Sequence, residues 1–499
     1  MTIRLVVDGR GTLRRGILDA LVAQADGRVE IALHLGDRDA DFHAACLQRM
    51  EVRNGKLGHL LRDHQTRGAD MALLASPGFQ NLMATAVDQM HRGSQYYNYR
   101  SHNLVNLQDY LDYYHIVTEA LADRIAAAGA THALFMNMPH LGYDTMLYQV
   151  ARGMGLKTLV LCQTTYSDRF FSMERIEDMG QFDPRDTDAP PLPIKKGDQP
   201  DLFYMDDRWQ TEGPRGRITR AAVANYLKHI VLRDPASLLR PDRMIADLRR
   251  ISAIYGALPD WRDPFAKFFH RNEMPYYEKL ASFEGQAVDY AAKFVYIPLH
   301  NQPEMSTSAL GGVFRDQALM VETVARHLPQ GWRIYVKENP RQNSFARGPL
   351  FWHRLSRLPS VQILPSHAPT HELTARAQLT ATVAGTAGWE ALIKGRPALV
   401  FGGGWWKSFP GVSRFHEGID LQAVAATTFP HEALEHAAGQ LIARCHDGVI
   451  ELLYSRMKQA LDERANVATA AKGILDLLEG RVAPTFRASK EDPCPTASS

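Results

Sequence analysis

A short glycine-rich segment in the C-terminal half of the chain, Gly385-Thr386-Ala387-Gly388, places backbone amides and one hydroxyl side by side. An apolar run precedes it and a helix-like stretch follows it, so its amides are expected at a helix N-terminus. Such amides bind phosphate because they donate hydrogen bonds and the helix dipole favours negative charge. Glu390 is expected on the first turn of this helix, where its carboxylate could accept hydrogen bonds from ribose hydroxyls. The segment predicts nucleotide binding; the simpler interpretation is a glycine turn with Glu390 capping the helix.

Two further loops in this region combine groups that bind phosphates and sugars. One follows the apolar run Trp332–Val336, and its Lys337 and Asn339 could contact a phosphate or a base. The other follows Phe294–Ile297 and mixes an imidazole, amides, a carboxylate and hydroxyls, a set suited to a sugar acid or a diphosphate. Its candidates are His300, Gln302, Ser306 and Glu304, the last also as an alternative catalytic carboxylate. The simpler interpretations are a solvated turn for the first loop and a self-hydrogen-bonded loop for the second.

Titratable side chains in the N-terminal half stand where two strands are expected to end. His140 and Asp144 follow the strand-like run His132–Met136, and Asp168 follows Thr158–Cys162. Because carboxyl ends of parallel strands meet at one edge, these side chains are expected at one cleft. There a carboxylate or imidazole could act as acid, base or nucleophile, and Asp144 is the first candidate because it stands just before a predicted helix. A capping role for each is an equally simple interpretation.

The elements that position these residues alternate between strands and helices in both halves. The N-terminal half is expected to hold strands Ile3–Val7, Val29–Leu35, His132–Met136 and Thr158–Cys162, and helices Leu107–Ala128 and Thr145–Gly153. The C-terminal half is expected to hold strands Phe294–Ile297, Trp332–Val336, Leu379–Val383 and Pro397–Phe401. Such alternation predicts an α/β fold with two doubly wound, Rossmann-like parallel sheets, whose ligands lie outside the carboxyl ends of the strands.

Length and local composition predict the domain boundaries. A chain of 499 residues exceeds what one hydrophobic core usually organises. Residues 1–183 are expected to form the first domain and residues 293–480 the second. Between them, residues 184–292 read as a loop followed by a helical insertion, and residues 481–499 read as a disordered tail.

Composition argues against several classes of protein. The formal net charge of +2 gives no nucleic-acid signature, and four cysteines without CxxC spacing argue against structural zinc or disulfides. Asp37-Arg38-Asp39 matches a short metal-binding pattern, but such tripeptides are common by chance, so no metal is expected. The N-terminus lacks the apolar core of a signal peptide, and no apolar stretch approaches the ~20 residues of a membrane span. We therefore expect a cytoplasmic location.

A series of motifs follows in order along the C-terminal half: Pro298–Glu304, Ser306–Ser308, Leu310–Gly312, Val336–Pro340, Gly385–Leu392 and Val400–Gly402. Together they resemble the bacterial capsule polysaccharide biosynthesis family, which includes β-Kdo transferases. The resemblance covers the C-terminal half well and the N-terminal half loosely. One position departs from the pattern. The family usually has His-Pro after Lys-Glu, whereas this chain has Asn339-Pro340, and asparagine can donate a hydrogen bond but cannot carry charge.

The resemblance implies the GT-B arrangement, in which two Rossmann-like domains face a cleft with donor nucleotide on the second and acceptor on the first. It implies a glycosyltransferase of capsular polysaccharide, with CMP-Kdo as the leading donor and a glycan or glycolipid as acceptor. No cofactor beyond the nucleotide-sugar substrate is implied, and contact with the inner membrane or the capsule assembly machinery would be peripheral. Two alternatives stay open: a nucleotide-sugar 2-epimerase-type enzyme, and a non-catalytic polysaccharide-assembly scaffold, the latter suggested by Asn339.

Overall fold

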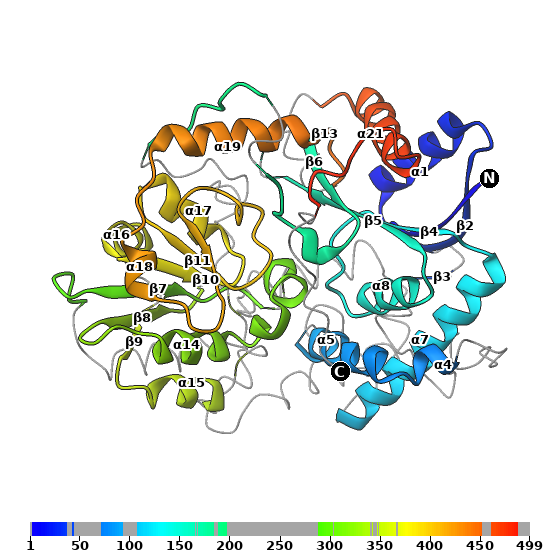
Figure 1. The fold of residues 1–499 in the computed structure, drawn as a ribbon. Helices are drawn as coiled ribbons and strands as arrows, with labels where there is room; N and C mark the ends of the chain where they lie inside the picture. The colour runs from blue at the N-terminus through cyan, green and yellow to red at the C-terminus, as the bar shows by residue number, and fades with distance from the viewer. Residues whose placement is uncertain are drawn as a thin grey trace, which may run out of the picture.

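The computed structural model describes residues 2–36, 42–43, 71–92, 107–164, 166, 168–183, 188–196, 288–302, 304–339, 342, 347, 349–365, 368–451 and 461–487. Residues 197–287, which include most of the expected helical insertion, lie outside these ranges. So do residues 488–499 of the expected tail and the Asp37-Arg38-Asp39 tripeptide. The described residues form two sheets with helices packed on both (Figure 1).

The first sheet comes mainly from the N-terminal part of the chain, with strand order β13-β6-β5-β4-β1-β2-β3. Its strands are β1 (Ile3–Asp8), β2 (Val29–Gly36), β3 (Phe42–His43), β4 (His132–Phe135), β5 (Lys157–Gln163), β6 (Arg169–Met173) and β13 (His446–Asp447). Strands β1 to β5 are parallel, as expected. The expectation of a wholly parallel sheet is wrong at β6, which runs antiparallel to β5 because a short hairpin joins them instead of a helical crossover.

The second sheet has the order β12-β11-β10-β7-β8-β9, and its described strands are all parallel. They are β7 (Phe294–Pro298), β8 (Arg333–Lys337), β9 (Val361–Leu364), β10 (Leu379–Thr382), β11 (Ala398–Val400) and β12 (Val412–Arg414). Strand order reverses at β7 here and at β1 in the first sheet. Both sheets are therefore doubly wound, which confirms two Rossmann-like domains. The crevices expected to hold ligands lie between β1 and β4 and between β7 and β10.

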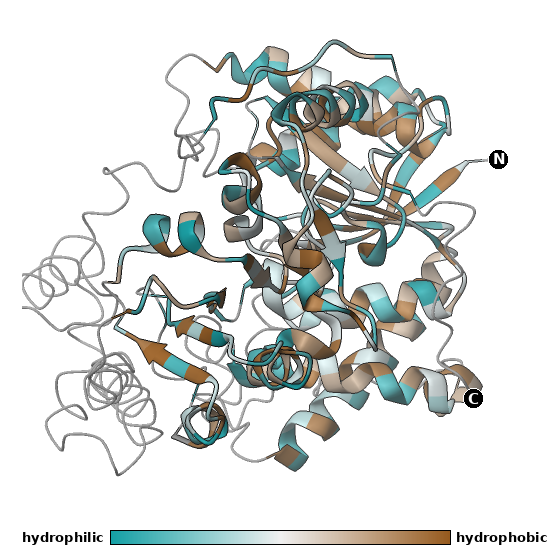
Figure 2. Cartoon of the chain, turned by 60° about the vertical axis from the view of Figure 1, so that its left-hand side comes forward, coloured by the Kyte–Doolittle hydropathy of each residue, from teal (hydrophilic) through white to brown (hydrophobic). Residues whose placement is uncertain are grey.

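Helices cover the two sheets. On the first they are α1 (Thr12–Ala25), α4 (Met71–Leu74), α5 (Pro77–Arg92), α7 (Leu107–Ala128) and α8 (Tyr143–Gly153). With the second are α14 (Gln317–Arg326), α15 (Pro349–Ser356), α16 (Thr370–Arg376), α17 (Thr386–Ile393), α18 (Leu421–Ala425) and α19 (His431–Arg444). Strand β7 is buried over most of its length and apolar throughout, as expected for an inner strand of a parallel sheet, and the helices show both hydrophobic and hydrophilic residues along their surfaces (Figure 2). None of the described helices is both long and apolar enough to cross a membrane.

The C-terminal part of the chain returns to the first sheet. Strand β13 pairs with β6, and α21 (Glu463–Leu478) packs against α1, which places the red and blue ends of the ribbon side by side (Figure 1). Phe486 is fully buried and its ring centroid lies 4.8 Å from that of Phe171. The sequence-based boundary at residue 480 is therefore wrong in two respects: α21 belongs with the first sheet, and residues 481–487 are packed because Phe486 completes an apolar core.

The two domains touch through glycines and short polar contacts. Gly180 has φ 75°, and a Cβ there would lie 2.0 Å from the carbonyl oxygen of Gly404 in the second domain. Nearby, Nζ of Lys407 donates to the carbonyl of Glu177 at 3.1 Å, and Oγ of Ser408 donates to the carbonyl of Gly180 at 2.7 Å. The segment Gly404–Ser408 thus packs against the first domain at the domain interface.

Candidate functional site

The loop after β7 is anchored against the glycine-rich turn by His300. Its Nε2 lies 2.5 Å from Oγ1 of Thr382 at the end of β10, and the same hydroxyl accepts a hydrogen bond from the amide of Gly385 at 3.2 Å. Burial and, to a smaller extent, the nearby Arg347 cation lower the pKa of His300 to about 4, so the ring is neutral. A Cβ at Gly385 would lie 2.0 Å from Cε1 of the imidazole. The ring therefore supports the turn by direct packing.

An ion pair with fully buried side chains joins the loops after β7 and β8. Nη1 of Arg347 lies 2.6 and 2.7 Å from the two carboxylate oxygens of Glu338. Nη2 of Arg347 donates to the carbonyl of His300 at 2.7 Å, and Glu338 accepts the amide of Asn339 at 2.7 Å. A buried pair needs such additional hydrogen bonds to offset the desolvation of both charges. The pair therefore fixes the backbone at both His300 and Asn339.

Three glutamines extend this network. The backbone N–H of Gln302 donates to Oε1 of Gln342 at 2.8 Å, and Nε2 of Gln342 donates to the backbone carbonyl of Gln302 at 2.9 Å. Gln317, which begins α14, accepts the amide of His300 at 2.7 Å and donates to its carbonyl at 3.2 Å. The polar groups of His300 and Gln302 are thus buried and engaged within the protein, as in the self-hydrogen-bonded interpretation of this loop.

The other two candidates of the loop face solvent. Glu304 is exposed, and Ser306 is partly exposed within the π-helical turn η5 (Met305–Ala309). Oγ of Ser306 lies 3.3 Å from a carboxylate oxygen of Glu304. This part of the loop is accessible to a ligand, unlike the buried part around His300.

The glycine-rich turn opens α17, as its composition predicts. Gly385 precedes the helix, and Thr386 is the first helical residue and is partly exposed, while Ala387 is buried. A Cβ at Gly388 would lie 2.0 Å from Cη2 of the buried Trp406 ring. The need for glycine at 388 therefore comes from core packing, and not from close approach of a ligand to the backbone.

Glu390 and Lys337 both reach the start of α16. Glu390 is buried in the second turn of α17, not in the first turn as expected, and its carboxylate lies 4.0 Å from Nδ1 of His371. Lys337 ends β8 and donates through Nζ to Oγ1 of Thr370 at 2.6 Å. The fold thus brings these two predicted residues to one helix end, although they come from different loops.

Two carboxylates lie at the crevice between β1 and β4. Asp8 ends β1 and is partly exposed, whereas Asp144 lies in the first turn of α8 and is buried. Burial raises the pKa of each to about 6, and the Asp144 charge adds to the rise at Asp8. Asp144 accepts hydrogen bonds from the amides of His140 at 3.0 Å, Leu141 at 2.7 Å and Thr145 at 2.7 Å. Asp144 therefore holds the loop before α8, which is a capping role.

The surroundings of Asp8 combine hydrogen-bonding and basic groups. The hydroxyl of Tyr143 donates to Oδ1 of Asp8 at 3.1 Å, and the Arg10 guanidinium lies 5.4 Å from the Tyr143 ring centroid. Nδ1 of His140 donates to the carbonyl of Met138 at 2.7 Å, which leaves Nε2 as its acceptor nitrogen. Burial lowers the pKa of His140. The crevice thus pairs carboxylates that hold a proton near pH 6 with a neutral imidazole.

Asp168 lies apart from this group. It is exposed in the hairpin between β5 and β6, with a left-handed φ of 62°, and its carbonyl accepts the amide of Gly448 at 2.7 Å. The hairpin stands on the β6 side of the sheet, away from the β1/β4 crevice. Because β4 and β5 are parallel and the hairpin follows the carboxyl end of β5, Asp168 lies at the same edge of the sheet as Asp144, but beside β5 and β6.

Three further residues belong to the site, and their sequence signals differ: Asp8-Gly9-Arg10-Gly11 is a plausible but weak acceptor or phosphate loop, whereas Arg347 and Gln89 stand in no motif. Asp8 carried a signal, since it ends the first apolar run and precedes Gly9-Arg10-Gly11. Arg347 and Gln89 carried none, because each acts through partners far away in the chain: Arg347 through Glu338 and His300, and Gln89 through the loop that leads to α8.

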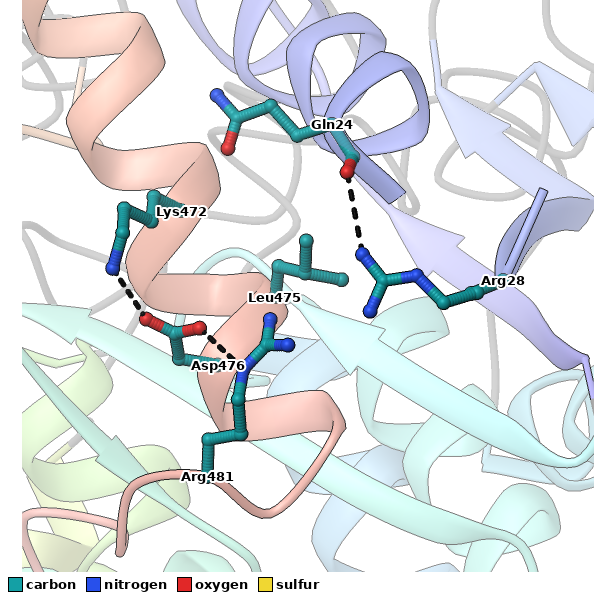
Figure 3. Close-up of a pocket in the computed structure, with 6 residues that line it drawn as sticks. All are labelled: Gln24, Arg28, Lys472, Leu475, Asp476 and Arg481. Atoms are coloured by element: carbon teal, nitrogen blue, oxygen red, sulfur yellow. Dashed lines mark hydrogen bonds and ion pairs between the residues drawn. The ribbon is translucent and has the colours of Figure 1, made fainter. Parts of the chain in front are cut away.

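Pockets on the described surface differ in their relation to these crevices. One lies between α1 and α21 near Arg28, at the opposite end of β1 from Asp8; there Lys472 and Arg481 both pair with Asp476, at 2.9 and 2.7 Å (Figure 3). Arg28 and Arg481 also pair with Glu479, so the cations of this pocket are engaged in ion pairs. Another, of about 400 Å³, lies where the domains meet and is lined from both sides, by Asp88, Arg92, Val313, Arg315, Asp316, Arg347, Leu350, Phe351 and Arg354. The second pocket lies beside the loop that carries Arg347, and none of the site residues predicted from the sequence is among those that line it.

Comparison with known proteins relates the second domain to one protein family. Residues 282–444 match the sequence model of the capsule polysaccharide biosynthesis protein family. No curated protein sequence matches. Among solved structures, the chain is similar to the β-Kdo 2,7 transferase of Thermosulfurimonas dismutans (14% identity, 46% of this chain and 66% of that one, TM-score 0.25) and to its β-Kdo 2,4 transferase (14%, 62% and 79%, 0.26). It is also similar to UDP-GlcNAc 2-epimerase of Methanocaldococcus jannaschii (10%, 89% and 99%, 0.24). The family match spans the second sheet as far as α19, so this part of the chain is similar to the capsule polysaccharide biosynthesis family.

Proposed function

We propose that the chain is a glycosyltransferase of capsule polysaccharide biosynthesis. A nucleotide-sugar donor binds at the carboxyl edge of the second sheet, and a glycan or glycolipid acceptor binds at that of the first. The observation that carries the proposal is Asp8, a partly exposed carboxylate with a raised pKa at the crevice of the domain facing the family-matched one. A titratable group of this kind, placed where ligands of doubly wound sheets bind, is suited to acid–base chemistry.

On the donor side, the amides at Gly385–Gly388 and the Thr386 hydroxyl bind the phosphate at the start of α17. Lys337, Asn339 and Glu390 contact the phosphate, base or ribose, and Glu304 and Ser306 contact the sugar from the solvent-facing end of the polar loop. His300 and Gln302 do not contact the ligand. Their hydrogen bonds to Thr382 and Gln342 hold the loops at fixed positions. Within the polar loop this division follows burial, because the side chains of Glu304 and Ser306 are accessible to a ligand, whereas those of His300 and Gln302 are buried and hydrogen-bonded.

On the acceptor side, deprotonated Asp8 accepts the proton of the attacking acceptor hydroxyl. The hydroxyl oxygen forms a bond to the anomeric carbon, and the bond from that carbon to the nucleotide phosphate breaks with its electron pair leaving on the phosphate oxygen. Asp144 holds the His140 loop in place through three backbone hydrogen bonds. His140 offers a neutral Nε2 as a second acceptor for hydroxyl groups.

The leading donor is CMP-Kdo, because the Lys337–Pro340 segment resembles that of transferases that use cytidine nucleotides. We place the reaction in the cytoplasm, with the acceptor presented at the inner membrane. Neither a metal nor a further cofactor is part of this proposal.

The test is incubation of the full chain with CMP-Kdo, UDP-GlcNAc and UDP-glucose, with and without capsule-type glycolipid acceptors, followed by mass spectrometry of the products. Transfer to an acceptor by the wild type, lost in Asp8→Asn, is the expected result. Inversion at C2 of the donor sugar without acceptor would instead establish the epimerase alternative. Donor binding without any turnover would establish the scaffold.

A further inference from the structure

Gln89 is a fully buried amide on a helix face that is otherwise apolar. It is 1% exposed, and its neighbours on the buried side of α5 include Ala86, Val87 and Met90. Burying an amide is costly unless its donor and acceptor are both bonded. The position therefore requires specific partners, and these lie in two different domains.

The amide oxygen of Gln89 holds the loop that leads into α8. It accepts the backbone N–H of Gly142 at 3.1 Å and the hydroxyl of Thr145 at 2.5 Å. Gly142 has φ 88°, a backbone conformation that other residues rarely adopt. Gly142 and Thr145 stand on either side of Asp144, so Gln89 fixes both ends of the segment whose carboxylate holds His140.

The amide nitrogen of Gln89 reaches the second domain. Nε2 donates to the carbonyl of Ser308 at 3.0 Å, within the turn η5 that follows the polar loop after β7. The orientation of the amide is determined by its partners. Reversal would turn the NH₂ group toward two donors and the oxygen toward a carbonyl.

A second contact joins the same elements. A carboxylate oxygen of Asp88, adjacent to Gln89 on α5, lies 3.9 Å from Nε of Arg315 in η6 (Gly312–Arg315). This pair is partly exposed, so it contributes little energy by comparison with a buried bond. Gln89 is therefore the specific link where α5 meets the loops of the second domain.

We propose that Gln89 is a positioning residue that holds the acceptor-side loop His140–Asp144 at a fixed position relative to the donor-side loop Glu304–Ser308. This inference rests on the proposed transferase function. A bound donor that orders the second-domain loop would, through the hydrogen bond between Ser308 and Gln89, also order the segment that carries Asp144. The residue does not touch the reacting atoms; it acts through the two loops.

The kinetic test compares Gln89→Met, Thr145→Val and Gln108→Met. Methionine keeps the length of the side chain and removes all three bonds, whereas Thr145→Val removes only one bond within the first domain. Gln108 is exposed on α7, so Gln108→Met is a matched control. For Gln89→Met we expect kcat to fall roughly tenfold or more with donor affinity within about twofold. Thr145→Val should lose less, and the control nothing.

The pH profile separates positioning from a purely structural role. If the loop loosens in Gln89→Met, water reaches Asp8 and Asp144, and the acidic limb of kcat moves to lower pH. A folded Gln89→Met protein with wild-type kcat and pH profile would overturn the proposal.

A measurement independent of turnover separates this inference from the proposed function. Spin labels at His115→Cys and Glu417→Cys, both exposed, would report the interdomain distance by pulsed electron resonance, with Cys46 and Cys494 changed to serine. We expect Gln89→Met to broaden the distance distribution and Thr145→Val to leave it unchanged. An unchanged distribution in Gln89→Met would overturn the interdomain link even if transfer is observed, and a broadened one would support the link even if no donor is turned over.

Discussion

Gly388 and Trp406 are in such close contact that a Cβ at 388 would lie 2.0 Å from Cη2 of the indole ring. Gly388→Ala is therefore expected to destabilise the second domain, by about 1–3 kcal/mol from overpacking. Trp406→Leu in the same chain should recover part of this loss by vacating the space, although Trp406→Leu alone is destabilising. Gly78→Ala is the control, because nothing lies within 4 Å of its Cβ position. Denaturant unfolding measures all four proteins, and additive effects of the two changes would contradict the contact.

The raised pKa values of Asp8 and Asp144 predict how the rate falls at acidic pH, the acidic limb of the pH–rate profile. Since both pKa values are raised to about 6, a base that must be deprotonated loses activity as the pH falls through about 6. Asp8→Asn should abolish this limb together with about a hundredfold or more of kcat. Asp144→Asn should shift the limb of its residual activity to lower pH, because one negative charge beside Asp8 is gone. Initial rates from pH 4.5 to 8 test this, with circular dichroism confirming that each variant is folded at each pH. A limb that stays at the same pH in Asp144→Asn would refute the coupling.

His300 predicts a pH dependence of stability. Its pKa is about 4 in the folded chain, below its ordinary value, so between about pH 6.5 and 4 the unfolded chain binds a proton that the folded chain does not. As the pH is lowered through this window, protonation of this residue in the unfolded chain should reduce the free energy of unfolding by about 3 kcal/mol. His300→Gln has no such proton to bind. The difference between wild type and variant in urea midpoint at pH 7 and pH 4.5 isolates the effect, and parallel pH curves would exclude it.

The buried pair of Arg347 and Glu338 predicts a large effect of breaking it. Arg347→Met leaves the Glu338 carboxylate buried without its cation and should cost roughly 3–5 kcal/mol. Arg376→Met breaks the exposed i,i+4 pair with Glu372 and should cost less than about 1 kcal/mol. Thermal and urea unfolding of the two variants provide the comparison. Equal losses would mean that the buried network does not hold the loops.

Nucleotide affinity tests the donor crevice without reference to turnover. Calorimetry is expected to show CMP binding more tightly than UMP, UDP or ADP. Thr386→Val and Glu390→Gln should each weaken CMP by roughly 1–3 kcal/mol if they donate to phosphate and accept from ribose. Ser356→Ala, a change in the exposed end of α15, is the control. Tighter binding of UDP than of CMP would exclude CMP-Kdo as the donor. Unaltered CMP affinity in both site variants would show that the nucleotide does not bind at Thr386 and Glu390.

Sequence patterns predicted most of the elements but not the contacts between their loops. The bounds of α7 are as expected, because Tyr110, Tyr114, Val117 and Leu121 repeat at helical spacing and are buried. The short strand β9 was not predicted, since four residues carry little periodicity. The buried roles of His300 and Gln302 depend on Gln317, Gln342 and Arg347, whose proximity arises only when the sheet assembles. A polar loop that binds a ligand and one that bonds to itself have the same composition, so pattern alone could not separate them.

Because the chain returns to the first sheet through β13, α21 and Phe486, the two domains can complete their folding at different times during synthesis. The second sheet is encoded by one continuous stretch and can close as soon as that stretch leaves the ribosome. The first domain must wait, because β13 and α21, which complete it, are made after the whole of the second sheet. A chain that stops after α19, at residue 445, would thus contain every described element of the second domain but lack β13, α21 and Phe486 of the first, so truncation here is expected to destabilise the domain that contains β1.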